Sequence, residues 1–405
     1  MRKLAGSFVF FVWIFSIFSF CFSQEFPFIT IETSQFKKTI IRVPDFSGEG
    51  GEKAARLLRR LLNYHLFFIT LKSPPLPGFR TKEYYVKGAV LKENGNLVIQ
   101  AELWDVLENK LIKTFKVYGK ASLEYLVYRL CDRIVENISR YHGIAETKIA
   151  FVKKGEPRDS LYLIYFSKVH RYLIDKAPLI LFPKFSPSGK KLAYVVYKDN
   201  RYILKVLDLT RHSRRVIPLK GISSAPVWSP DEKGLFLTLT LQDKIAICYL
   251  DLNTQKLREI FRADGVVQVA SVSPDGKTIA YVWDPGTGPQ VYTFNLITRQ
   301  RKRISSEGKY NTSARFLPTG DKLLYLSKHG ATTTIIIKNL KNGKTLKIET
   351  GFYLEDPALS PWGDYILAWG QSRKGKGLYL IHLDSGLGFL YLPGKKIISP
   401  TWAPF

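Results

Sequence analysis

VSPDGKTIAYV, residues Val272 to Val282, is the stretch of sequence that decides the fold. Pro274 fixes the backbone at the first central position of a tight turn, and Gly276 accepts the left-handed conformation that follows. Apolar, β-branched and aromatic residues come directly after the turn, as in a β-strand. The stretch therefore predicts two antiparallel strands joined by a tight turn.

The same pattern occurs six times at a nearly constant spacing. The steps between successive motif prolines are 43, 44, 44, 43 and 43 residues, and these prolines are Pro187, Pro230, Pro274, Pro318, Pro361 and Pro404. A second turn signal, such as Leu250-Asp-Leu-Asn-Thr254, follows later in each of the five full units. A strand-rich repeat of this length is typical of the four-stranded blades of a β-propeller.

The sixth copy of the motif has no strands after it. A fragment at 147–175 has the opposite defect, because Lys148 to Val152 matches the second strand of a unit and no Ser-Pro turn precedes it. An open ring would leave unpaired strand edges. We therefore expect Ile397 to Phe405 to supply the innermost strand of that first blade. The sequence predicts an all-β six-bladed β-propeller over 146–405, closed by pairing of its N-terminal and C-terminal strands.

Residues 24–145 carry no repeat and predict a small α+β domain with an extended N-terminal segment. Apolar spacing indicates one helix from Glu52 to Leu62 and a second from a cap at Ser122 to about Tyr141. The strands that we expect are 39–46 and a meander of 84–91, 97–106 and 111–118.

Residues 1–23 have the pattern of a cleaved secretory signal peptide. Arg2 and Lys3 precede an apolar run from Phe8 to Phe22, and Cys21 and Ser23 stand at the positions that a signal peptidase reads. An uncleaved membrane anchor is the alternative, although the run is short for a span. Attachment of a lipid at Cys21 is disfavoured by the bulky Phe20 before it. We expect export to the periplasm of a Gram-negative envelope.

The formal net charge is +27, and most of the excess lies in the repeat region. An exported chain does not ordinarily meet nucleic acid, so we expect no nucleic-acid partner. An anionic envelope surface, an acidic protein face or a lysine-rich proteome would each account for the charge. Without the signal segment only Cys131 and Cys248 remain, and they fall in different predicted domains. We expect two buried free thiols.

Propellers often carry active sites, so motifs for catalysis or ligand binding would be informative in this sequence. The sequence has no Gly-x-Ser-x-Gly elbow, its six histidines stand singly, and Asp284 to Gly288 reads as a turn inside a blade. We therefore expect no catalytic residues, no cofactor and no metal, and binding remains as the class of function.

Together these features resemble the TolB family, the periplasmic propellers of the Tol–Pal system. Phe352 to Pro361, Gly288 to Tyr292, Lys148 to Val152 and Ser399 to Phe405 are similar to segments of that family. The resemblance implies a non-enzymatic scaffold that supports outer-membrane integrity and envelope constriction during cell division. It implies that the lipoprotein Pal and the protein TolA are the binding partners. Other outer-membrane lipoproteins or porins are further candidate partners, and the chain is expected to be a monomer.

The resemblance also implies where the partners bind. Pal would contact the channel entrance, formed by the loops before each innermost strand; the positions are Ile222, Ala225, Gln268, Asn311, Thr312, Glu355, Asp356 and Ser399, beside Ile398. TolA would pair with the alternating segment Phe28, Ile29, Thr30, Ile31 and Glu32. Ile222 stands where the family usually has a polar contact, and the family's basic residue in the N-terminal segment is missing; both departures concern partner affinity.

Two other functions stay open at this point. A periplasmic propeller that binds a small ligand or a peptidoglycan fragment would have no need of a free N-terminal strand. A hydrolase without a recognisable motif would act on peptide or sugar substrates, which an assay can test.

Overall fold

The computed structural model describes residues 38–75, 82–119, 122–219, 225–242 and 244–404. The expected signal peptide and the expected TolA-binding segment lie outside these residues. Within them, an α+β domain precedes a propeller of six four-stranded sheets, as the sequence predicts. None of the helices among the described residues is long and apolar enough to cross a membrane.

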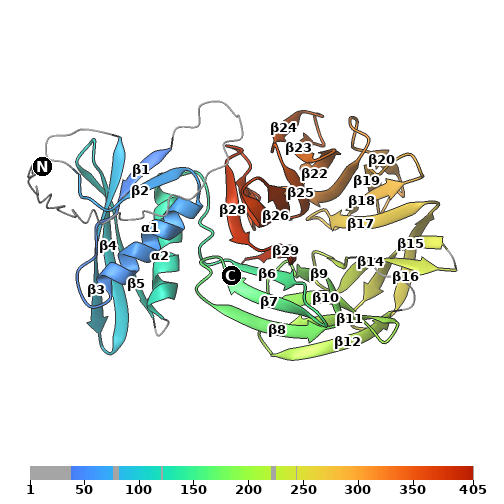
Figure 1. Cartoon of the computed structure of the whole chain (residues 1–405), viewed down its shortest axis with the longest axis horizontal. Helices are drawn as coiled ribbons and strands as arrows, with labels where there is room; N and C mark the ends of the chain where they lie inside the picture. Colours follow the sequence, from blue (N-terminus) through green and yellow to red (C-terminus); the bar gives the residue numbers. More distant parts are fainter. Residues whose placement is uncertain (1–37, 76–81, 120–121, 220–224, 243, 405) are drawn as a thin grey trace, which may run out of the picture.

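The α+β domain is one five-stranded sheet covered by two helices (Figure 1). The strand order is β2-β1-β3-β4-β5, and β1 pairs in parallel with both of its neighbours. The strands are β1 Thr39–Arg42, β2 Phe68–Leu71, β3 Glu83–Glu93, β4 Asn96–Asp105 and β5 Lys110–Gly119. The helices are α1 Gly51–Tyr64 and α2 Leu123–Ile138. Ser122 caps α2 by accepting a hydrogen bond from Tyr125 N.

Five blades follow the order of the sequence, each with its innermost strand first. The first two are β9 Leu179–Phe185, β10 Lys191–Lys198, β11 Arg201–Asp208, β12 Ser213–Leu219, and β13 Val227–Trp228, β14 Gly234–Leu241, β15 Lys244–Asp251, β16 Leu257–Ala263. The third is β17 Val266–Val272, β18 Thr278–Asp284, β19 Gln290–Asn295, β20 Arg301–Arg303. The last two are β21 Asn311–Phe316, β22 Lys322–His329, β23 Thr332–Asn339, β24 Thr345–Glu349, and β25 Tyr353–Leu359, β26 Tyr365–Ser372, β27 Gly375–His382, β28 Gly388–Pro393.

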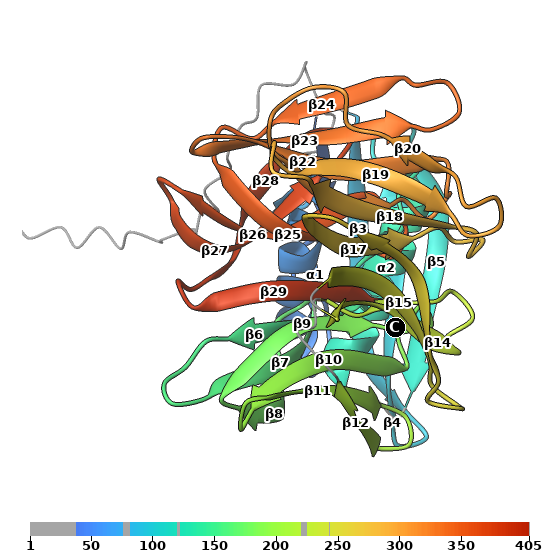
Figure 2. The ribbon, with the colours of Figure 1, turned by 90° about the vertical axis from the view of Figure 1, so that its right-hand side faces the viewer.

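The remaining blade joins the two ends of the propeller sequence. Its order is β29-β6-β7-β8, with β29 Ile397–Ala403, β6 Lys148–Lys153, β7 Asp159–Tyr165 and β8 Arg171–Ala177. The strand β29 runs antiparallel to β6, with Trp402 opposite Ile149, and Figure 2 shows the two strands side by side. The closure expected from the incomplete repeat is confirmed.

The two domains share one hydrophobic core. The ring of Tyr64, at the end of α1, stacks on Phe389 of the propeller with centroids 5.6 Å apart. Tyr365 Oη donates a hydrogen bond of 3.0 Å to the carbonyl of His65. Lys168 Nζ donates to Tyr391 O at 2.7 Å and lies over the Tyr64 ring. The α+β domain is therefore packed against the propeller (Figure 1) rather than tethered beside it.

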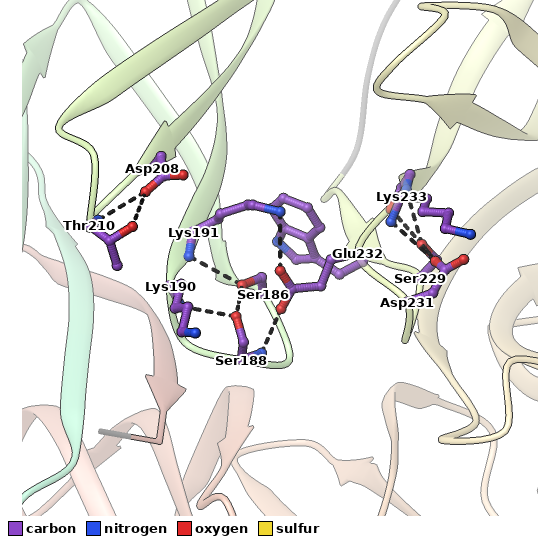
Figure 3. A network of polar contacts seen from close by, with 12 residues as sticks. Ser186, Ser188, Lys190, Lys191, Asp208, Thr210, Ser229, Asp231, Glu232 and Lys233 are labelled. Carbon is purple, nitrogen blue, oxygen red and sulfur yellow. Dashed lines mark hydrogen bonds and ion pairs between the residues drawn. The ribbon is translucent and has the colours of Figure 1, made fainter.

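The first two blades in sequence are also tied together through their motif turns (Figure 3). Glu232 takes the position that glycine holds in the other four full motifs, and it has a left-handed backbone with φ of 56°. Its carboxylate reaches the preceding blade, where it accepts a hydrogen bond of 2.6 Å from Ser188 N and pairs with Lys191 Nζ at 3.2 Å. The Glu232 side chain thus makes a contact between two blades, although the left-handed backbone at this position is unfavourable for a residue other than glycine.

We expect Glu232→Ala to lower the free energy of unfolding by about 1 kcal/mol, because one charge-assisted hydrogen bond and one half-buried ion pair are lost. Thermal unfolding followed by circular dichroism measures the change. Glu307→Ala is the matched control, since Glu307 pairs with Lys347 on the surface with 65% of its side chain exposed. Equal melting temperatures for the two variants would contradict an inter-blade role for Glu232.

Candidate functional site at the channel mouth

The channel mouth is built from the beginnings of the innermost strands. The predicted residues Ala225, Gln268, Thr312 and Asp356 come from four different blades, and they line one cavity together. The other lining residues are Phe182, Lys184, Val269, Ala270, Val282, Ser313 and Arg315. The cavity has a volume of about 80 Å³. This is room for one small chemical group, since a water molecule occupies roughly 30 Å³.

β-Bulges aim side chains at this cavity. The innermost strands β9, β17, β21, β25 and β29 each shift register against the next strand of their blade. In four of them the residue five positions before the motif proline has a left-handed backbone; these residues are Phe182, Ser313, Asp356 and Ser399. Because a bulge turns the strand locally, it redirects the neighbouring side chains. The repetition of the bulge makes the mouth a regular feature of the ring.

Two cations from opposite blades face this cavity. Lys184 and Arg315 each stand three residues before their motif proline, and their blades are three steps apart in a ring of six. Backbone carbonyls hold the guanidinium, since Arg315 Nε donates to Pro357 O at 3.0 Å and Nη1 donates to Ala270 O at 3.0 Å. Lys184 Nζ has no hydrogen-bond or ion-pair partner among the described residues.

Burial sets the charge balance of the mouth. Desolvation lowers the pKa of Lys184 to about 7, the charge of Arg315 adds to this effect, and Asp356 opposes it. Desolvation also lowers the pKa of Arg315, against the attraction of Asp356. Asp356 accepts a hydrogen bond of 3.3 Å from Ser399 Oγ, which brings a fifth predicted residue to the same place.

Two other predicted residues lie differently. Asn311 is fully buried, and its Nδ2 donates to Gln290 Oε1 at 2.9 Å and to Glu307 O at 2.7 Å, so its side chain supports the loop from within. Glu355 points to the side, where its carboxylate pairs with Lys328 Nζ at 2.8 Å and accepts from the Tyr353 hydroxyl. Ile222 and the segment 28–32 lie outside the described residues.

Sequence reasoning missed Lys184 and Arg315. The expected entrance loop lies five to eight residues before each motif proline, whereas both cations stand at the third residue before it. When the repeats are aligned on their motif prolines, the third position before the proline holds a basic residue in two of the six blades, and this is a signal that the sequence does offer. Only the bulged strands of the structure show that both face the cavity.

A buried group near the domain boundary has the composition of a metal site. Ligand atoms of His65, Cys131 and Asp132 lie within 4.8 Å of one another. Both nitrogens of His65 are occupied, because Nδ1 contacts Leu61 O at 3.0 Å and Nε2 accepts from Ile144 N at 3.4 Å. Burial also raises the pKa of the Cys131 thiol, which disfavours the thiolate that metals bind. The group fits a packed core better than a metal centre.

Comparisons with known proteins match the propeller and the whole architecture. The family described as the TolB beta propeller domain matches residues 135–405. This chain belongs to the TolB propeller family. The Tol-Pal system protein TolB of Francisella tularensis subsp. tularensis strain FSC 198 is 25% identical over 341 residues, which cover 79% of this chain and 75% of the relative. The counterpart from strain SCHU S4 matches equally.

Solved structures agree on the fold. The crystal structure of TolB from Acinetobacter baumannii covers 91% of this chain and 97% of its own, with a TM-score of 0.82 and 21% identity. A chain in the crystal structure of a nidogen/laminin complex matches over 64% of this chain and 98% of its own length, with a TM-score of 0.52 and 12% identity. The first match covers more of this chain than the propeller strands alone can account for. The resemblance to the family drawn from the sequence is confirmed.

Proposed function

We propose that this chain is a non-enzymatic periplasmic scaffold of the Tol–Pal system, with Pal bound at the channel mouth and TolA bound by the segment Phe28 to Glu32. One observation supports the Pal site above the others: Ala225, Gln268, Thr312 and Asp356, expected from the family as contacts, converge on a single cavity. Ser399 joins them through Asp356. The TolA site rests on the family resemblance.

The geometry suits a protein partner that covers the mouth. The cavity admits one small group, and the polar side chains around it can accept or donate hydrogen bonds to a docked surface. Hydrogen bonds from Asn311 Nδ2 to the carbonyls of Glu307 and Gly308 hold the loop before β21 in place. Because the loop is already ordered, it loses less conformational entropy when a partner binds. A scaffold role needs such a preformed surface and no reactive group.

The test is calorimetric titration of the mature chain, from Gln24, into the periplasmic domain of the Pal-like lipoprotein of the same organism. We expect Gln268→Arg to weaken binding by at least tenfold, because the longer side chain fills the small cavity at the mouth and blocks the docked surface. Gln300→Arg is the matched control, since Gln300 is exposed in the β19–β20 turn at the opposite end of the blade. Failure of the unaltered chain to bind would contradict the proposal.

A second candidate is a small ligand or a peptidoglycan fragment in a groove between the last two blades in sequence. This groove has a volume of about 1060 Å³ and is lined by Tyr353, Trp369, Gln371 and Arg373, among others. Aromatic rings beside polar side chains suit a sugar or peptide ligand. Titration of the chain with soluble peptidoglycan fragments, with Trp369→Ala in parallel, separates this function from the scaffold.

A further inference from the structure

The unpartnered ammonium of Lys184 is the feature that the scaffold role leaves unexplained. The Lys184 side chain is only partly exposed, and a cation with reduced access to water is costly unless it is paired; Lys184 Nζ has no partner among the described residues. It lies in a cavity with Arg315, whose guanidinium is held by carbonyls that do not cancel its charge. Among the residues that the structure describes, Asp356 is the only carboxylate that lines the cavity. Two cations against one anion leave a net positive charge at the mouth.

We propose that the channel mouth is an anion site that takes the carboxylate of an acidic side chain from the protein that docks on the entrance. This inference rests on the proposed function, and it names the chemistry by which the partner is recognised. A carboxylate between Lys184 and Arg315 would form charge-assisted hydrogen bonds in a place where water is limited. The cavity volume of about 80 Å³ suits a single carboxylate with little water beside it.

The neutral lining supports a carboxylate in the same way. Gln268 comes from β17 and Thr312 and Ser313 come from β21, so hydrogen-bond donors surround the two cations. The positive charge also accounts for part of the basic character of the propeller, because it places cations where a partner arrives. Lys328 is already paired with Glu355 and does not contribute to this site.

The first experiment measures binding of the Pal-like periplasmic domain to the unaltered chain and to Lys184→Met. Methionine matches the unbranched apolar stem of lysine up to Cε and lacks the ammonium group. We expect binding to weaken by tenfold to a hundredfold. Lys190→Met is the matched control, since Lys190 is exposed in the motif turn at the other end of β9. Circular dichroism confirms that both variants are folded.

The second experiment uses pH. The charged groups that face Lys184 are Arg315 from β21 and Asp356 from β25. The pKa of Lys184 is about 7, so the ammonium is lost between pH 6 and pH 8. We expect the affinity of the unaltered chain to fall as the pH rises from 6 to 8, and the affinity of Lys184→Met to change less.

The outcomes separate this inference from the proposed function. Weakening by Gln268→Arg without weakening by Lys184→Met would leave the scaffold intact and overturn the anion site. No binding by the unaltered chain would overturn both. Titration with acetate tests whether the mouth binds small anions, with the ¹³Cε signal of Lys184 as the readout. If this signal responds to acetate but Lys184→Met does not weaken binding of the lipoprotein, the assignment to a partner's side chain would be overturned.

Discussion

Trp402→Ala is expected to lower the free energy of unfolding by about 3–5 kcal/mol, among the largest effects of any single substitution in this chain. The indole is 7% exposed and stacks on Phe166 with ring centroids 5.6 Å apart. Its Nε1 donates a hydrogen bond of 2.8 Å to Thr147 Oγ1, just before β6. The truncation therefore leaves a cavity where β29 meets β6 and removes the donor from a buried hydroxyl.

The measurement is thermal or urea unfolding of the mature chain. Trp402→Phe should cost less than alanine, because the ring is largely kept and only the bond to Thr147 is lost. Trp283→Ala is the matched control: Trp283 is half-buried on β18, and its Nε1 bonds Asp264 O. If Trp402→Ala cost no more than Trp283→Ala, the joint between β29 and β6 would not hold the ring closed.

The propeller could be predicted from sequence because its signals are local and repeated. Each turn depends on a proline and a residue with a left-handed backbone that are close in sequence, such as Pro274 and Gly276 with φ of 72°. The hydroxyl of Ser273 closes the turn by accepting from Thr278 N at 2.9 Å. Five intact copies and one divided copy then fix the number of blades, since a ring must close.

Other parts of the fold depend on contacts that are distant in sequence. The strand Phe68–Leu71 was not predicted, because it is short, follows a helix closely and pairs in parallel with β1. The first strand was predicted to extend to Phe46 but ends at Arg42, where Val43 N turns to bond Leu71 O outside the ladder. Parallel pairing leaves no turn between the two strands for the sequence to show.

The sequence predicts which loops form the candidate site, but it does not predict which side chains of these loops face the cavity. Ala225, Gln268, Thr312 and Asp356 line the cavity, whereas Asn311 is buried by partners from β19 and from its own loop. The direction of each side chain depends on a bulge, and one residue more or less reverses it. Whether these residues bind a partner stays a prediction that the titrations test.

Asp132→Ala is the second substitution for which we expect a large loss of stability, about 2–6 kcal/mol. The carboxylate of Asp132, on α2, accepts hydrogen bonds from Ala145 N at 2.8 Å and from Glu146 N at 3.0 Å. These amides belong to the connection between the two domains. Alanine would leave both without their acceptor, at about 1–3 kcal/mol for each buried donor. Equal stability of Asp132→Ala and the unaltered chain would mean that water replaces the carboxylate.

Asp132 also makes the free energy of unfolding depend on pH, and its contribution falls as the pH rises. Burial raises the pKa of Asp132 to about 8, against the two backbone bonds, which lower it. A group whose pKa is raised on folding stabilises the protein below its unfolded pKa, and this contribution is lost as the pH rises towards 8. The loss approaches about 1.4 kcal/mol per pH unit for one fully coupled proton.

Two buried histidines act in the opposite direction at lower pH. Burial lowers the pKa of His65 and of His382 to about 4, so each destabilises the fold as the pH falls from 6.5 towards 4. The interval from pH 6.5 to 8 lies above the range in which the histidines act, but Lys184 and Lys168, whose pKa values burial lowers to about 7 and about 8, also titrate there. The comparison is therefore between two chains that share these lysines: in urea unfolding, we expect the stability of the unaltered chain relative to Asp132→Asn, which mimics the protonated carboxyl, to fall over this interval. Parallel profiles would assign the dependence on pH to other groups and leave Asp132 only its role as the acceptor that fastens the connection between the domains.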